Sequence, residues 1–101
     1  MVADDPHDEL EGLGFETRAI HAGQPPDPQT GAVTVPIGLA TTFAQPEVGS
    51  EQPFEYARSG NPTRAALEAC LASLEGASHG FAFSSGLAAE DAVLQAADRG
   101  W

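Results

Sequence analysis

The position of the prolines divides this chain into two parts that cannot fold in the same way. All eight prolines lie at or before Pro62, while residues 63–101 have none and are rich in Ala and Leu. Because proline fixes φ and removes a backbone hydrogen-bond donor, long helices and central strands are not expected in the first part. We therefore predict a disordered acidic tail over 1–12, an extended arm over 13–60, and a folded α/β segment over 61–101.

Two short segments of the arm have the composition of regular structure. Residues 15–20 predict a single helical turn, and residues 33–35 predict a short extended stretch. Neither segment is long enough to bury itself alone.

From Asn61 onward the pattern predicts a helix, a buried strand and a second helix. Asn61 can cap a helix, the proline after it suits the first helical position, and apolar residues recur at helical spacing until Gly76, so we expect a helix from about 62 to 75. The apolar run 80–83 is typical of a strand covered on both faces, and the second helix is expected from about 86 to 97. Because a buried strand needs neighbours on both sides, this order predicts a fragment of an α/β sheet.

The charge of the chain excludes several classes of partner. Fifteen carboxylates oppose four cationic side chains, all of them arginine, which gives a formal net charge of -11. Such a chain repels phosphate backbones and anionic lipid, so neither nucleic acid nor a membrane surface is an expected partner. No apolar run approaches the ~20 residues that cross a bilayer, and the acidic start does not resemble a secretory signal. We expect a cytoplasmic location.

Metal and disulfide chemistry are not expected either. Cys70 is the only cysteine, so no internal disulfide can form. The three histidines, His7, His21 and His79, have no metal-ligand spacing with one another or with Cys70. We assign no metal site.

The junction between the predicted strand and the second helix, residues 83–87, is the first candidate site. A helix that follows a strand exposes free backbone N–H groups at the positive end of its dipole, which suits an anion such as phosphate. Gly86 would let the backbone approach such a ligand closely. The alternative is that Ser84 and Ser85 only cap a structural helix, and the sequence leaves both interpretations open.

The second candidate is the segment 55–63. If residues 55–59 are extended, Tyr56 and Arg58 point to the same side and could bind one phosphate together. Taken alone, a surface ion pair is the simpler interpretation of Arg58, because many carboxylates are available in so acidic a chain.

Several segments together resemble one family of enzymes. Residues 56–63 form a Tyr-x-Arg-x-Gly-Asn-Pro-Thr block, and further likeness lies in residues 17–23, 35–37, 41–43 and 83–89. In order and spacing these segments are similar to the opening of the Cys/Met-metabolism enzymes that depend on pyridoxal 5'-phosphate (PLP). The family includes cystathionine γ-synthase, cystathionine γ-lyase and cystathionine β-lyase, and the resemblance runs from about residue 14 to 99.

The resemblance implies an α/β fold, the N-terminal fragment of a type I, aminotransferase-like PLP-dependent transferase. Residues 61–101 would be the truncated start of the PLP-binding domain, and subunits of the family pair into dimers, usually dimers of dimers. In such enzymes the residues that match Tyr56 and Arg58 bind the cofactor phosphate of the neighbouring subunit. The backbone that matches Gly86 and Leu87 binds the phosphate of its own subunit's cofactor.

The absence of lysine limits what the chain can do alone. Family chemistry begins with a lysine Schiff base to PLP, and none of the 101 residues is lysine, so we assign no catalytic residue. We predict a partial enzyme similar to cystathionine γ-synthase, which replaces the γ-substituent of an O-acyl-homoserine with cysteine to give cystathionine. A cystathionine γ-lyase-like fragment remains open. So do a non-catalytic subunit that assembles with a full-length homologue across a dimer interface, and an unfolded product of an interrupted reading frame.

Overall fold

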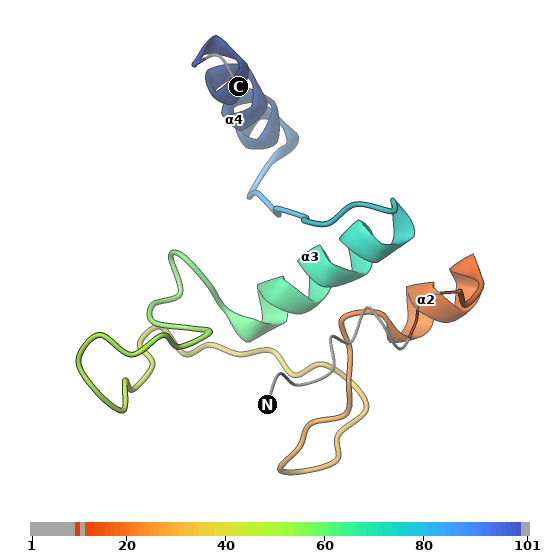
Figure 1. The fold of residues 1–101 in the computed structure, drawn as a ribbon, viewed down its shortest axis with the longest axis vertical. Coiled ribbons are helices and arrows are strands. Elements are labelled where there is room, and N and C mark those ends of the chain that lie inside the picture. The colour runs from red at the N-terminus through yellow and green to blue at the C-terminus, as the bar shows by residue number, and fades with distance from the viewer. Residues whose placement is uncertain (1–9, 11, 100–101) are drawn as a thin grey trace.

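The computed structural model describes residue 10 and residues 12–99, in which three helices follow one another along the chain (Figure 1). They are α2 (Phe15–His21), α3 (Pro62–Leu74) and α4 (Gly86–Asp98). A long irregular arm joins α2 to α3, and a single isolated antiparallel bridge is recorded in it, between Thr42 and Tyr56. Most of the acidic tail expected over 1–12 lies outside the described residues.

The three helices begin and end close to the predicted positions, and local side-chain capping explains where α3 and α4 begin. The side-chain Oδ1 of Asn61 accepts a hydrogen bond from the Thr63 amide at 2.9 Å, which caps α3 as expected. After the end of α3, Gly76 adopts a φ of 64°, a left-handed conformation that glycine favours. The Ser85 hydroxyl accepts from the Ala88 amide at 3.1 Å and caps α4.

The strand predicted over residues 80–83 does not form. Within the described residues, the recorded hydrogen bond of the Ala82 amide is to the Glu68 carboxylate of α3 at 2.8 Å, and Phe81 is 76% exposed. A strand is defined by hydrogen bonds to a neighbouring strand, and the described part of the chain offers none here. For the same reason the extended stretch predicted over 33–35 is not a strand, and a bend occupies residues 33–34.

The closest packing in the described chain lies between α2 and α3, which Figure 1 shows side by side. The turn after α2 lies so close to α3 that a Cβ added at Gly23 would come within 2.6 Å of the Ala66 carbonyl oxygen. Arg18 of α2 donates a hydrogen bond through Nη1 to the Ser73 carbonyl of α3 at 2.6 Å. Ala22, next to Gly23, is fully buried.

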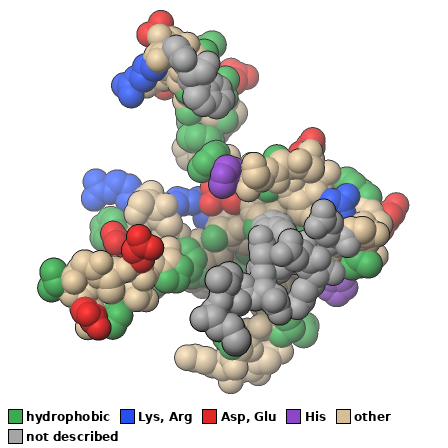
Figure 2. Space-filling view, in the orientation of Figure 1, with side chains coloured by type: hydrophobic (Ala, Val, Ile, Leu, Met, Phe, Trp, Pro, Cys, Tyr) green, Lys and Arg blue, Asp and Glu red, His purple; other side chains and the backbone are tan. Residues whose placement is uncertain are grey.

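Many large apolar side chains lie open to solvent, and Figure 2 shows hydrophobic side chains scattered over the visible face. Ala22 and Ala72 are the buried hydrophobic residues of the described chain. The total accessible surface is 8215 Å², whereas a compact monomer of this mass exposes about 5,400 Å². No helix in the described ranges is both long and apolar enough to cross a bilayer.

Candidate functional site

A tight turn places Tyr56 and Arg58 together. Tyr56 lies in the bridge with Thr42, and its carbonyl accepts hydrogen bonds from the amides of Ser59 and Gly60, each at 3.1 Å. Residues 57–59 therefore turn, and the extended conformation assumed for 55–59 is wrong. The turn still stacks the side chains, because Cζ of Arg58 lies 5.3 Å from the centre of the Tyr56 ring.

The Arg58 guanidinium keeps its hydrogen-bond donors available. Within the described residues it makes no ion pair and no hydrogen bond, and the ion pair recorded there joins Arg64 to Glu68 at 3.7 Å. The interpretation of Arg58 as one half of a surface ion pair is therefore wrong for these residues. Its cation–π contact with Tyr56 contributes about 0.5–1 kcal/mol at an exposed site and leaves the N–H groups free. The pair thus presents a phenol and a guanidinium to an anion.

The first turn of α4 also carries hydrogen-bond donors without a partner in the described chain. The amides of Gly86 and Leu87 have no hydrogen-bond partner in the described chain, as is usual for the first turn of a helix. A Cβ added at Gly86 would meet nothing within 4 Å, so no packed side chain covers the turn. Ser85 caps the helix, while Ser84 makes no such bond in the described part of the chain. The capping role and the anion-binding role are therefore compatible.

The chain does not bring the two candidates together. No hydrogen bond or ion pair of the described residues joins segment 55–60 to segment 83–88. Figure 1 shows α4 projecting away from α3, while the arm that precedes α3 lies apart from α4 in this view.

Sequence reasoning missed a second role of the Asn61-Pro62-Thr63 segment. Besides capping α3, Asn61 donates through Nδ2 to the carbonyls of Gly38 and Ala40, at 3.1 and 3.4 Å. The Thr63 hydroxyl exchanges hydrogen bonds with the backbone of the same stretch of the arm. No local pattern could have indicated these contacts, because the partners lie 21 to 27 positions away in the sequence.

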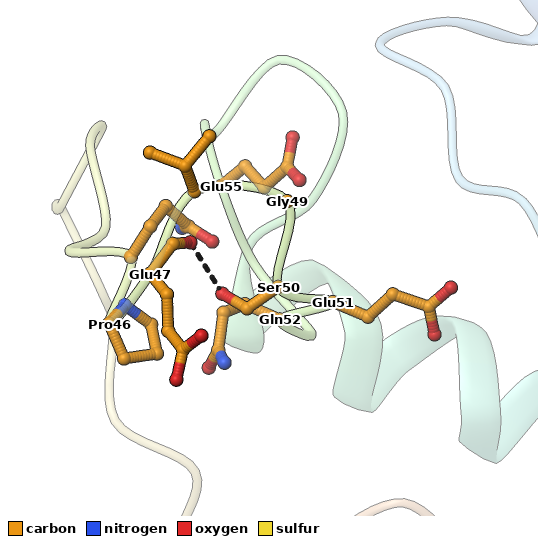
Figure 3. A pocket seen from close by; sticks show the side chains of 9 residues that line it. Pro46, Glu47, Gly49, Ser50, Glu51, Gln52 and Glu55 are labelled. Carbon is orange, nitrogen blue, oxygen red and sulfur yellow. Dashed lines mark hydrogen bonds between the residues drawn. The ribbon is translucent and has the colours of Figure 1, made fainter.

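A hollow within the loop 45–55 is not an anion site. Its lining includes the carboxylates of Glu47, Glu51 and Glu55, which would repel phosphate. Figure 3 shows these three side chains pointing in different directions, while the Ser50 hydroxyl donates to the Glu47 carbonyl at 2.8 Å. No group of three potential metal ligands was found in the described residues.

Comparison with known proteins assigns this chain to a family. The model of the Cys/Met metabolism PLP-dependent enzymes matches residues 16–100. A cystathionine γ-synthase of Mycobacterium tuberculosis is 62% identical over 84 residues, which are 82% of this chain and 22% of that protein. A cystathionine β-lyase of Coxiella burnetii is 57% identical over 81 residues, which are 80% of this chain and 21% of that protein.

The solved structures agree with this assignment. The structure of cystathionine γ-lyase from Lactobacillus plantarum, complexed with L-serine, matches with a TM-score of 0.76 and 52% identity. The match covers 82% of this chain and 22% of that one, and the chain spans about a fifth of the length of the curated relatives above. These structures have the type I fold of PLP-dependent enzymes, which confirms the predicted fold class. The chain belongs to the family of Cys/Met metabolism PLP-dependent enzymes.

Proposed function

We propose that this chain binds the phosphate group of pyridoxal 5'-phosphate through two separate sets of donors. The first set is the Tyr56 hydroxyl and the Arg58 guanidinium, and the second is the backbone amides of Gly86 and Leu87. One observation carries the proposal: in the described residues, none of these donors makes a hydrogen bond within the chain. Unpaired, accessible donors are what an anionic ligand requires.

The fit to a phosphate group is supported at both places. At α4, the helix dipole adds roughly half a positive charge to the two amides, and Gly86 leaves space for close approach. At the arm, Arg58 supplies a full positive charge in a planar fork that matches phosphate oxygens. Because no hydrogen bond or ion pair of the described residues joins the two sets, we propose that each serves a different subunit's cofactor in a homo-oligomer.

The chain's own part in the chemistry is binding and orientation. When bound, PLP supplies an electron sink for reactions at the α-carbon of an amino acid. Tyr56, Arg58 and the amides of α4 would hold its phosphate and so fix the ring relative to the substrate. The chain contains no lysine, so it supplies no ε-amine for covalent attachment of the cofactor.

As the activity of the whole protein we propose that of a cystathionine γ-synthase, which joins cysteine to an O-acyl-homoserine. The higher identity to relatives named γ-synthase, 62% against 57% for a β-lyase, supports this choice. A γ-lyase-like activity is the alternative, and the name of the Lactobacillus plantarum neighbour favours it. We further propose a cytoplasmic location, which the single cysteine supports.

A second candidate function is that of a non-catalytic subunit that assembles with a full-length homologue. One observation favours it: the chain exposes far more surface than a compact monomer of its mass does. In that case Tyr56 and Arg58 would complete a site on the partner. Co-purification of the tagged chain with a full-length homologue tests this second function. A monodisperse folded monomer that does not bind the homologue would exclude it.

Phosphate binding is tested by titrating isotope-labelled chain with inorganic phosphate and following nuclear magnetic resonance (NMR) signals. We expect concentration-dependent shifts of the Gly86 and Leu87 amides and of the Arg58 Nε–H signal. Arg58→Ala should remove the response at Tyr56 and leave that of α4 unchanged. Arg99→Ala, which deletes the same charge after the end of α4, is the matched control and should change neither. If neither set responds in the unsubstituted chain, the proposal is wrong.

A further inference from the structure

We propose that Asn61 and Thr63 are positioning residues for the Tyr56–Arg58 pair. Their side chains fasten the arm segment 36–40 to the first turn of α3, and we call this set of hydrogen bonds the clasp. The inference deepens the proposed function, because it rests on Tyr56 and Arg58 being the phosphate-binding pair. Its structural part can be measured without any ligand.

The Asn61 side chain uses both ends of its amide. Its Oδ1 accepts from the Thr63 amide at 2.9 Å, and this bond alone satisfies the helix cap. Its Nδ2 donates to the Gly38 carbonyl at 3.1 Å and reaches the Ala40 carbonyl at 3.4 Å. A carboxylate could replace the first function but not the second, because it has no N–H to donate.

The Thr63 hydroxyl completes the clasp. It accepts a hydrogen bond from the Gly38 amide at 2.7 Å and donates one to the Pro36 carbonyl at 2.8 Å. The Gly38 backbone approaches so closely that an added Cβ would lie 3.4 Å from Oγ1 of Thr63. Residues 36, 38 and 40 are therefore held to one end of a helix by side chains, without any strand pairing.

The bridge transmits this constraint from the arm to Tyr56. Directly after the clasp, the Thr41 carbonyl accepts from the Ala57 amide at 2.7 Å, and the Phe43 amide donates to the Glu55 carbonyl at 3.1 Å. These two bonds flank Tyr56 on both sides. The rings of Phe43 and Phe54, with centroids 5.6 Å apart, pack beside them.

Tyr56 and Arg58 thus lie on a closed loop with both ends fixed. One end is the bridge, and the other is Asn61 itself, which follows the turn at 57–59 by two residues. Releasing the clasp would free segment 36–40, and with it Thr42, the bridge partner that holds Tyr56. The turn would then sample other conformations, and the guanidinium would leave the Tyr56 ring.

Two substitutions release the clasp by different chemistry. Asn61→Asp keeps the helix cap, since Asp is as good an N-cap as Asn, but loses both donated bonds. Thr63→Val keeps the side-chain shape and loses both hydroxyl bonds, without adding charge. Thr63→Ser retains the hydroxyl and is the matched control.

The test measures amide hydrogen exchange of Ala57 and Phe43 by NMR, together with the ring-current shift of the Arg58 side-chain protons over Tyr56. In Asn61→Asp and Thr63→Val we expect exchange at least tenfold faster and Arg58 shifts that move toward random-coil values. Thr63→Ser should match the unsubstituted chain, and the amides inside α3 should be unaffected in all variants. Unchanged exchange and shifts in both releasing variants would overturn the inference, as would an absence of protection in the unsubstituted chain.

Repeating the phosphate titration on the same variants separates this inference from the proposed function. With the clasp released, the affinity reported by Arg58 should fall severalfold, while the Gly86 and Leu87 amides respond as before. If the unsubstituted chain does not bind phosphate but the amide hydrogen exchange of Ala57 and Phe43 still depends on Asn61 and Thr63, the proposed function is wrong and the positioning role stands. If phosphate binds and both variants bind it equally well at Arg58, the positioning role is wrong.

Discussion

Replacing Gly23 with alanine should separate α2 from α3, and the structure allows the size of the effect to be worked out. Gly23 has a φ of 74°, and an added Cβ would lie 2.6 Å from the Ala66 carbonyl oxygen and 2.9 Å from Cβ of Ala69. The left-handed conformation costs an alanine about 1–2 kcal/mol. Overpacking against a helix backbone that cannot give way adds about 1–3 kcal/mol.

Gly31→Ala is the matched control for this substitution. Gly31 has the same φ of 74°, but an added Cβ there would meet nothing within 4 Å. It therefore carries the conformational cost without the clash, and the difference between the two variants isolates the contact with α3. We expect that difference to be about 1–3 kcal/mol in the free energy of docking α2 on α3.

The single cysteine reports on this docking. Cys70 lies on α3, is partly buried, and its Sγ lies 3.8 Å from the Ala19 carbonyl of α2, so the thiol becomes accessible when α2 leaves. If labelling by a disulfide reagent follows the undocked population, Gly23→Ala should label roughly 5- to 150-fold faster than Gly31→Ala. Equal labelling rates in the two variants would refute the reasoning. So would labelling of the unsubstituted chain at the rate measured in denaturant.

Two further predictions concern other segments. Gly80→Ala should displace the segment before α4, because the added Cβ would come within 2.5 Å of a backbone carbonyl oxygen of α3. We expect faster hydrogen exchange of the Ala82 amide, and unchanged exchange would contradict the prediction. Hydrogen bonds from the backbone amides of Thr30 and then Gln29 lower the pKa of Asp27 below its usual value of 3.8. Since the pKa of Asp27 is lower in the folded state, the ionised carboxylate stabilises the turn above pH 3.8, and the turn should loosen as the pH falls through the folded pKa. The NMR shifts of the Gln29 and Thr30 amides would follow this loosening. Asp27→Asn should abolish the pH dependence.

The parts of the fold that could be predicted from the sequence are those set by local chemistry. The start of α3 follows from the Asn61 side chain and the proline after it, and the glycine at 76 marks its end. The same holds for α4, where Ser85 provides the cap. Each of these signals acts over about four residues and needs no tertiary partner.

The parts that failed depend on partners far away in the sequence. Residues 80–83 have the composition of a strand, but a strand exists only beside another, and in the described chain the Ala82 amide binds a helix side chain instead. The alternation assumed for Tyr56 and Arg58 failed because a turn begins directly after the bridge. The clasp was missed because Asn61 and Thr63 look like ordinary capping residues until their arm partners are known.

The surplus surface of these 101 residues has a consequence for what must cover them. They expose 8215 Å², about 2,800 Å² more than a compact monomer of this mass, which exceeds the roughly 800 Å² that one partner buries in a standard protein–protein interface. Because these residues bury so little, they are open to chaperones and proteases until that surface is covered. Whatever covers this surface, further chain or a binding partner, then adds to the stability of these residues.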